Sequence, residues 1–159
     1  MGVSGSGKST LGRALAERMG GTFLDADDFH PEANVEKMRA GIALNDDDRA
    51  PWLVALNREL IRRRENKQQV VLACSALKAR YRDVLASGLP HLDWVFLDGD
   101  AAVIAARMAA RSGHYMPPSL LASQLAALER PMDAVLVDLS DSTSEQLAAV
   151  FAALAPRGA

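Results

Sequence analysis

A glycine-rich stretch near the start of the sequence has residue types and spacing that suit phosphate binding. Residues 2–10 read GVSGSGKST and fit the pattern G-x-x-x-x-G-K-[ST] without a gap. Glycines let the backbone take turns that other side chains would forbid, so successive N–H groups can point inward around phosphate oxygens. Lys8 would bring a positive charge to the β- and γ-phosphates of a nucleotide, and the Ser9 hydroxyl would be placed to bind Mg²⁺.

The same stretch could instead be a disordered, glycine- and serine-rich segment. An amphipathic segment, residues 11–19, follows it directly, which favours a loop that runs into a helix. A helix that begins near Lys8 would add its free N–H groups and the positive end of its dipole to the site. We therefore expect nucleotide-phosphate binding through nine consecutive residues, which are Gly2, Val3, Ser4, Gly5, Ser6, Gly7, Lys8, Ser9 and Thr10.

Acidic residues lie at the end of the next predicted strand, over residues 22–27. Alternation along a strand would put Asp25 and Asp27 on one face near the phosphate loop, with His30 shortly after them. One carboxylate there could hold Mg²⁺ or its water shell, and a second could accept a proton from an attacking hydroxyl. The alternative is a solvated turn in which a carboxylate caps a helix.

A run of three aspartates, residues 46–48, precedes Arg49. Taken alone, such a run is more often a solvated loop than a site. We expect its carboxylates to hold Arg49, which could then reach an anionic substrate. Asp48 could also cap a helix that starts near Pro51.

Arg107, Arg111 and His114 lie where a predicted helix ends and a loop with glycine and proline begins. The two arginines are four residues apart and share one helix face. Two guanidinium groups at such a place suit a lid that neutralises charge and excludes water during phosphoryl transfer. Alternatively, the arginines only complement the dipole at the end of the helix.

Cys74 and Ser75 lie at the end of another predicted strand, over residues 69–74. We interpret Cys74 as a small buried hydrophobic side chain, because the sequence suggests no partner histidine. Ser75 could face the phosphates. Lys78 and Arg82 follow on a predicted helix, where they form either a basic surface or contacts to a sugar acid or phosphate.

The composition narrows the class of protein. The 159 residues suit one domain with a sizeable core, since 49% of them are hydrophobic. A net charge of −2 argues against general nucleic-acid binding, which usually needs a basic surface. The single cysteine permits no internal disulfide, and no apolar run approaches the length of a membrane span. We expect a cytoplasmic protein that binds neither nucleic acid nor membrane.

Predicted strands alternate with predicted helices along the chain. The strands are expected over residues 22–27, 69–74, 94–97 and 134–139, and the helices over residues 8–19, 32–40, 51–65, 75–85, 101–111, 120–129 and 144–154. This alternation predicts an α/β fold with a parallel sheet covered by helices on both faces. Ligands of such sheets bind at the carboxyl ends of the strands, which is where the acidic cluster and Ser75 fall.

Several segments together resemble the thermoresistant-type gluconokinases, a family of small P-loop kinases. These segments are residues 2–9, 23–31 (FLDADDFHP), 34–41 (NVEKMRAG), 44–53 (LNDDDRAPWL), 74–83 (CSALKARYRD) and 111–115 (RSGHY). Residues 44–53 and 74–83 are the most specific of them, because P-loop kinases in general lack them.

The resemblance implies Mg²⁺- and ATP-dependent phosphorylation of D-gluconate to 6-phospho-D-gluconate, usually by a homodimer. It implies one three-layer P-loop kinase domain over residues 1–159 with strand order 2-3-1-4-5. A substrate-binding helical region is expected at about 30–66, and a lid at about 107–120. The alternatives are a kinase for another small hydroxy acid, such as shikimate, and a nucleotide-binding regulatory or chaperone-like protein that has lost catalysis. Residues 44–53 favour gluconate, and the acidic and arginine pairs favour catalysis.

The resemblance also implies a role for each candidate side chain. Lys8 would hold the phosphates, Asp25 would lie near the metal that Ser9 binds, and Asp27 would orient or deprotonate the 6-hydroxyl of gluconate. The candidates for catalysis are Lys8, Asp27, Arg107 and Arg111. The candidates for substrate binding are Asp27, His30, Arg49, Lys78, Arg82 and His114.

The sequence departs from the family pattern in two places. The stretch at 129–133 is compressed where a longer acidic loop is expected. Only Met1 precedes the phosphate loop, although such loops normally follow a buried strand. We hypothesise that Met1 is the last residue of a strand encoded upstream. We therefore expect residues 69–74 and 94–97 to flank a vacant slot instead of pairing directly.

Overall fold

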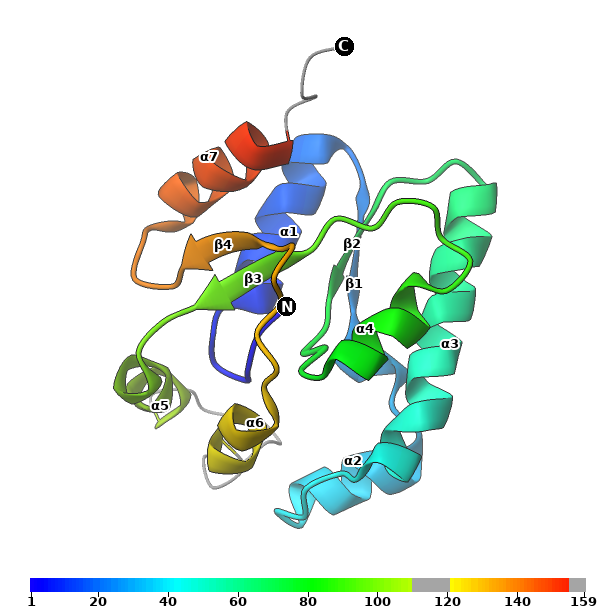
Figure 1. Cartoon of the computed structure of the whole chain (residues 1–159), viewed down its shortest axis with the longest axis vertical. Helices are drawn as coiled ribbons and strands as arrows, with labels where there is room; N and C mark the ends of the chain where they lie inside the picture. The colour runs from blue at the N-terminus through cyan, green and yellow to red at the C-terminus, as the bar shows by residue number, and fades with distance from the viewer. Residues whose placement is uncertain (110–120, 155–159) are drawn as a thin grey trace.

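The computed structural model describes residues 1–109 and 121–154 as short strands packed between helices (Figure 1). The helices are α1 (Lys8–Met19), α2 (Glu32–Arg39), α3 (Asp46–Glu65), α4 (Ala79–Ala86), α5 (Ala101–Ala109), α6 (Leu121–Ala127) and α7 (Thr143–Leu154). The strands are β1 (Thr22–Asp25), β2 (Val70–Ala73), β3 (Val95–Asp98) and β4 (Val135–Asp138), and a 3₁₀ helix, η1 (Ala26–Phe29), follows β1. None of the helices in these ranges is long and apolar enough to cross a membrane.

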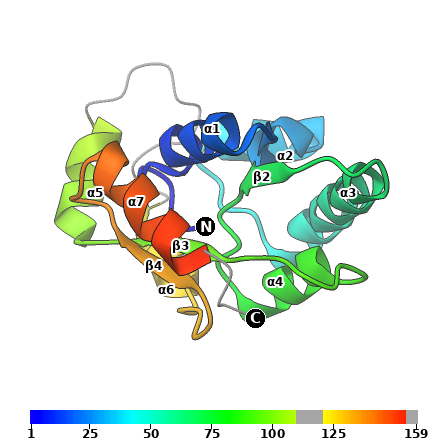
Figure 2. The same cartoon turned by 90° about the horizontal axis from the view of Figure 1, so that it is seen from above.

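The strands form two parallel pairs. β1 pairs with β2 so that Asp25 lies beside Ala73, and β3 pairs with β4 so that Asp98 lies beside Asp138. Helix α1 lies on one side of the strands, and helices α4 and α6 lie on the other (Figure 2). This is the α/β architecture, with helices on both faces of parallel strands, that the alternation of elements predicts.

The first residues of the chain lie between the two strand pairs (Figure 1). The Met1 nitrogen donates to the Val95 carbonyl, and the Leu97 N–H donates to the Met1 carbonyl at 3.0 Å. On the opposite side, the Gly2 N–H donates to the Ser75 carbonyl at 3.2 Å. Within the described residues, β2 and β3 form no ladder with each other. The prediction that segments 69–74 and 94–97 do not pair directly is therefore confirmed.

Next to Met1, a cavity of about 250 Å³ lies between β2 and β3. Its walls are mostly aliphatic side chains from the flanking strands and helices, among them Leu11, Leu60, Val71 and Val150. The arrangement of a strand pair, a gap and a second strand pair corresponds to the expected order 2-3-1-4-5, with the gap at the middle position. An extended segment in this gap could pair with the facing edges of both β2 and β3.

Three groups of buried side chains hold the elements together. One joins α3 to α4 and includes Trp52 and Leu85. A second joins α1 to α7 and to the β3–β4 pair, and includes Leu11 and Val150. The third surrounds Val3 and joins the phosphate loop to α5 and α6. The loop is thus part of the core rather than a free surface turn.

Several elements begin or end at residues other than those predicted, and two of these differences bear on the site. The strand predicted over 22–27 ends at Asp25, because the Asp25 carboxylate accepts the Asp27 N–H at 3.2 Å and starts the 3₁₀ helix η1. Helix α4 begins at Ala79 rather than at residue 75. Ala76 has a φ of 44°, a left-handed backbone that a right-handed helix cannot include. Asp27 therefore reaches its position through a helical turn and not through strand alternation.

We predict that an apolar five-residue extension before Met1 fills the cavity and stabilises the fold. The extension would add backbone hydrogen bonds on two edges and bury aliphatic side chains, so the thermal midpoint should rise by at least about 5 °C. Differential scanning calorimetry of the chain with five added valine and isoleucine residues measures this. A glycine and serine extension of equal length is the control, and equal midpoints for both extensions would contradict the prediction.

Candidate active site

The phosphate loop, residues 2–7, leads into α1 with a backbone that depends on glycine. Gly5 has a φ of 81°, and a Cβ atom there would lie 2.5 Å from the Met108 side chain of α5. Gly7, with a φ of 99°, precedes Lys8 as the N-cap residue, and no side chain in the described ranges caps this end of α1. The first N–H groups of α1 and the positive end of its dipole are thus available to an anion.

Two side chains at the start of α1 bind different partners. The Lys8 ammonium donates to the Val3 carbonyl at 2.9 Å, within the loop itself. The Ser9 hydroxyl donates to Oδ2 of Asp25 at 2.8 Å. The end of β1 therefore lies directly against the first turn of α1, and the hydroxyl and carboxylate expected near a metal are in contact.

These two oxygen ligands fit Mg²⁺ and not a metal held by protein alone. In the described part of the chain, no group of three or more histidine, cysteine, aspartate or glutamate side chains could hold a metal ion. Mg²⁺ usually takes one or two protein ligands and completes its octahedron with water and substrate phosphates. Ser9 and Asp25, beside a loop that suits phosphate, offer such a partial set.

A pocket of about 100 Å³ connects the phosphate loop to the carboxyl ends of β1 and β2. Both aspartates of the acidic cluster face this space, although Asp27 lies on η1 and not on the strand. Ser75 also lines it, as its position after β2 suggests. The charged and polar side chains around it include Lys8, Ser9, Asp25, Asp27, His30 and Arg49.

His30 is held in one orientation at the wall of this pocket. Its ring stacks on the Trp52 indole with centroids 4.2 Å apart and planes 15° apart, and Trp52 donates to the Ala26 carbonyl at 2.7 Å. Burial, followed by the positive charge of Arg49, lowers the pKa of His30 to about 4. The imidazole is therefore neutral at pH 7, with Nε2 3.9 Å from Oδ1 of Asp27.

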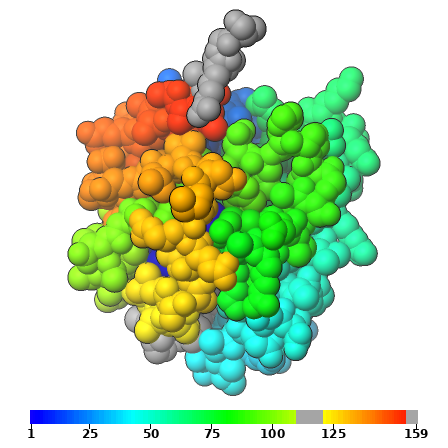
Figure 3. Space-filling model, in the orientation of Figure 1, coloured from blue at the N-terminus to red at the C-terminus, as the bar shows by residue number. Residues whose placement is uncertain are grey.

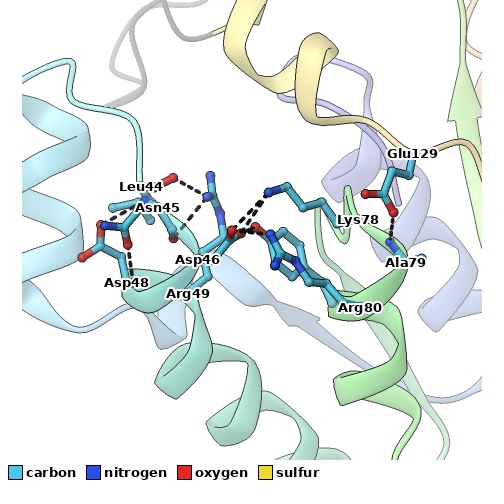
Figure 4. Close-up of polar contacts among 10 residues, drawn as sticks. Leu44, Asn45, Asp46, Asp48, Arg49, Lys78, Ala79, Arg80 and Glu129 are labelled. Carbon is cyan, nitrogen blue, oxygen red and sulfur yellow. Dashed lines mark hydrogen bonds and ion pairs between the residues drawn. The ribbon is translucent and has the colours of Figure 1, made fainter.

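The acidic run at 46–48 forms contacts other than those expected. Asn45 and Asp48 cap α3 with a reciprocal pair of hydrogen bonds, so the helix begins at Asp46 and not near Pro51. The Arg49 guanidinium donates to the carbonyls of Leu44 and Asn45. The expectation that the carboxylates of this run hold Arg49 is thus wrong, because backbone carbonyls one turn earlier take that role (Figure 4).

Asp46 instead joins the start of α3 to the start of α4. Lys78 donates to Asp46 at 3.0 Å, and Arg80 and Tyr81 also donate to it (Figure 4). The hydrogen bond from the Tyr81 hydroxyl, and then that from Lys78, lowers the pKa of the Asp46 carboxyl to about 2. A charged Asp46 at pH 7 therefore holds three donors of the segment 78–81 beside Arg49.

Like Arg49, the predicted site arginines Arg82 and Arg107 bind backbone carbonyls. Arg82 donates to the carbonyls of Ala76 and Glu129 at 3.1 Å, and so ties the segment before α4 to the segment after α6. Arg107 donates to the Leu139 carbonyl at 2.7 Å. Neither side chain lies among the described residues that line the pocket. Arg111 and His114 lie outside the described residues.

Cys74 agrees with its interpretation as a buried hydrophobic side chain. Burial raises the pKa of its thiol to about 11, so the reactive thiolate is scarce at pH 7. Two polar pocket residues, Ser123 and Gln124, belong to no motif that the sequence analysis identified. The sequence signal that could have identified them is their polar side chains, because the rest of the helix over residues 121–127 is apolar.

We predict that His30 makes the stability of the fold depend on pH between about 4 and 6.5. The pKa of His30 is about 4 in the folded chain, whereas an unfolded histidine titrates near 6.5. Its contribution is therefore complete above pH 6.5 and is lost as the pH falls towards 4. Urea unfolding across this range should show a smaller loss for His30→Gln than for wild type. His91→Gln changes an exposed histidine and is the control, and equal losses in all three proteins would contradict the prediction.

Comparisons with known proteins agree with this geometry. The AAA domain family matches residues 1–148. The thermosensitive gluconokinase of Escherichia coli K12 is 46% identical over 144 residues, which cover 88% of this chain and 77% of that protein. Among solved structures, a gluconokinase from Sinorhizobium meliloti 1021 superposes with a TM-score of 0.87 at 47% identity, covering 98% of this chain and 89% of that one.

A sugar kinase from Janibacter sp. HTCC2649 superposes with a TM-score of 0.91 at 43% identity, covering 98% of this chain and 93% of that one. The relatives thus share both sequence and fold over most of the length. The chain belongs to the gluconokinase family of P-loop kinases.

Proposed function

We propose that this protein phosphorylates D-gluconate with ATP to give 6-phospho-D-gluconate and ADP. The observation that carries the proposal is the 2.8 Å hydrogen bond between Ser9 and Asp25, in a pocket that also contains Lys8 and Asp27. This contact joins the phosphate loop to the carboxyl end of β1. A nucleotide phosphate, a metal ion and a proton acceptor can therefore meet in one small space.

The phosphate loop would bind the β- and γ-phosphates of ATP. The free N–H groups at the start of α1 would donate to the phosphate oxygens, and Lys8 would exchange its contact to the Val3 carbonyl for one to phosphate. Ser9 and Asp25 would hold Mg²⁺, which, when bound, neutralises charge on the phosphates. The contact between Ser9 and Asp25 would thus hold the two Mg²⁺ ligands next to the phosphate loop.

Asp27 would take the proton in the transfer step. The 6-hydroxyl oxygen of gluconate attacks the γ-phosphorus, the bond from that phosphorus to the β–γ bridging oxygen breaks, and ADP leaves. The hydroxyl proton passes to the Asp27 carboxylate. Asp27 suits this step because it lies on η1, directly after β1. It lines the pocket but is not one of the two residues expected to hold Mg²⁺.

The acceptor would bind between α3 and the carboxyl ends of the strands. Arg49 lines the pocket and would pair with the gluconate carboxylate, and His30 would donate to or accept from the hydroxyls. Lys78 is close by but bound to Asp46, and Arg82 is bound to carbonyls, so each would have to leave its present partner to touch substrate. The resemblance further supports a homodimer.

A kinase for another sugar acid is the alternative within enzymes, and a nucleotide-binding regulator without catalysis is the alternative outside them. The first would keep ATP use but prefer another acceptor. The second would bind nucleotide and form no product. The combination of Asp27 and Arg49 in one pocket favours catalysis over a regulator, which needs neither a proton acceptor nor a carboxylate partner. Among kinases, the resemblance of residues 44–53 favours gluconate over another acid.

We predict that ADP formation by this protein requires gluconate. A coupled assay over a panel of sugar acids and shikimate should give at least about tenfold higher kcat/KM for gluconate than for the next acid, since unmatched hydroxyls leave polar groups of the site unpaired. Lys8→Ala should lower turnover by about 100-fold or more, because it removes charge stabilisation at the transferred phosphate. Lys67→Ala, at an exposed lysine, is the matched control. Preference for another acid would assign a different substrate, and ADP formation independent of any acid would refute the proposal.

We predict that Asp27→Asn lowers kcat by about 100-fold or more and changes ATP affinity by less than about threefold. An amide can accept a hydrogen bond but cannot take a proton, and a general base contributes about 10²–10⁴ in rate. Single-turnover measurements separate transfer from binding. Asp28→Asn, on the same short helix but exposed, is the control. Unchanged single-turnover rates in Asp27→Asn would restrict Asp27 to a structural role.

A further inference from the structure

The first half of the phosphate loop has a buried N–H group whose partner comes from far away in the sequence. The Ser4 N–H donates to Oε1 of Gln124 on α6 at 2.7 Å, in a contact closed to solvent. Neighbouring N–H groups of the loop bind backbone instead, since Gly2 donates to Ser75 and Ser6 donates to Val3. Gln124 thus satisfies a loop donor that the backbone leaves unpaired.

The position of Gln124 is fixed by the packing of α6. Leu121, one turn earlier on the same face, packs in the cluster around Val3 of the loop. After the helix, the Glu129 N–H donates to the Leu77 carbonyl at 2.8 Å, and the Glu129 carboxylate accepts the Ala79 N–H at 2.7 Å. The space-filling view shows this segment lying against the one that leads into α4 (Figure 3). The Gln124 amide therefore approaches the loop from a well-anchored helix.

The loop is held on its other flank by α5. Gly5 lies so close to this helix that a Cβ atom would be 3.3 Å from the Ile104 carbonyl and 2.5 Å from Met108. Ser4 and Gly5 are adjacent, so α6 fixes one residue of the turn and α5 fixes the next. A change at either contact would alter the direction of the N–H groups that follow in the loop.

A neutral acceptor is the suitable choice at position 124. Gln124 lines the pocket in which the phosphates of a nucleotide would bind, and it is nine-tenths buried. A carboxylate could accept the same N–H but would repel the phosphates. An aliphatic side chain would pack equally well but would leave the Ser4 N–H buried without a partner.

We propose that Gln124 is a positioning residue of the nucleotide site, which acts through the Ser4 N–H to hold the phosphate loop in its nucleotide-binding form. This inference rests on the proposed use of ATP and extends it to a residue outside the loop motif. Gln124 should affect nucleotide affinity selectively, because gluconate would bind on the side of Asp27 and Arg49.

Gln124→Met tests the proposal, since methionine keeps the length of the side chain and removes its acceptor. Calorimetric titration without gluconate should show ATP binding about tenfold more weakly, which corresponds to about 1.4 kcal/mol. The KM for gluconate should stay within about twofold. Hydrogen exchange of the Ser4 amide, followed by NMR without nucleotide, should be at least about tenfold faster than in wild type.

Gln146→Met is the matched control. Gln146 is another buried glutamine, on α7, and its Nε2 donates to the Asp138 carbonyl at 3.0 Å; neither residue lines the pocket. This variant should lose thermal stability but keep wild-type ATP affinity and Ser4 exchange. If Gln124→Met does not fold, Gln124→Asn, one methylene shorter, makes the same comparison.

Equal ATP affinity in Gln124→Met and Gln146→Met, or unchanged exchange of the Ser4 amide, would overturn the proposal. So would an equal loss of ATP and gluconate affinity, which would indicate a general structural role. Failure of the proposed function has a separate signature. In that case wild-type protein would bind ATP in the calorimeter, but gluconate would cause no ADP formation.

Discussion

The site depends on how the backbone of the phosphate loop is held from several directions at once. Met1 and Gly2 connect it to β3 and to the segment after β2, and the Ser4 N–H donates to α6. Directly after the loop, the Ser9 hydroxyl of α1 donates to β1. A loop with so many glycines would otherwise sample many conformations. Because its N–H groups must converge on one phosphate, each outside contact reduces the entropy that nucleotide binding would have to overcome.

The positive charges around the pocket are held by the protein before any substrate binds. Lys8 and Arg49 donate to backbone carbonyls, whereas Lys78 and Arg80 donate to the Asp46 carboxylate. Carbonyls are weaker partners for a cation than carboxylates. Lys8 and Arg49 both line the pocket, so an anion that enters it would meet these two cations. Asp46 keeps the other two in place as part of the wall between α3 and α4.

Local motifs account for the parts of this arrangement that the sequence predicted. The glycine and lysine spacing predicted the loop, and the acidic residues after the first predicted strand predicted the contact partner of Ser9. Asp27 reached the pocket for a different reason than expected, since the Asp25 carboxylate ends the strand and starts a 3₁₀ turn. The residue type and its position near the strand end were sufficient to predict that Asp27 lies in the site, although the 3₁₀ turn that carries it was not predicted.

Contacts over long sequence separations could not be predicted in this way. Arg82, Arg107 and Gln124 bind groups that are 47, 32 and 120 residues away. Helix periodicity tells which residues share a face but not which carbonyl or N–H another element will present to them. The two arginines therefore suggested phosphate contacts from their charge, whereas Gln124 attracted no attention because it is neutral and belongs to no motif.

In the proposed reaction, one pocket brings the γ-phosphate, the metal ligands and the acceptor hydroxyl together with Asp27. A crystal structure with Mg²⁺, a non-hydrolysable ATP analogue and gluconate tests it most directly. We expect the 6-hydroxyl oxygen within about 3 Å of the Asp27 carboxylate and in line with the bond from the γ-phosphorus to its leaving group. Gluconate bound outside this pocket, or a 6-hydroxyl directed away from both Asp27 and the γ-phosphate, would contradict this role of the pocket.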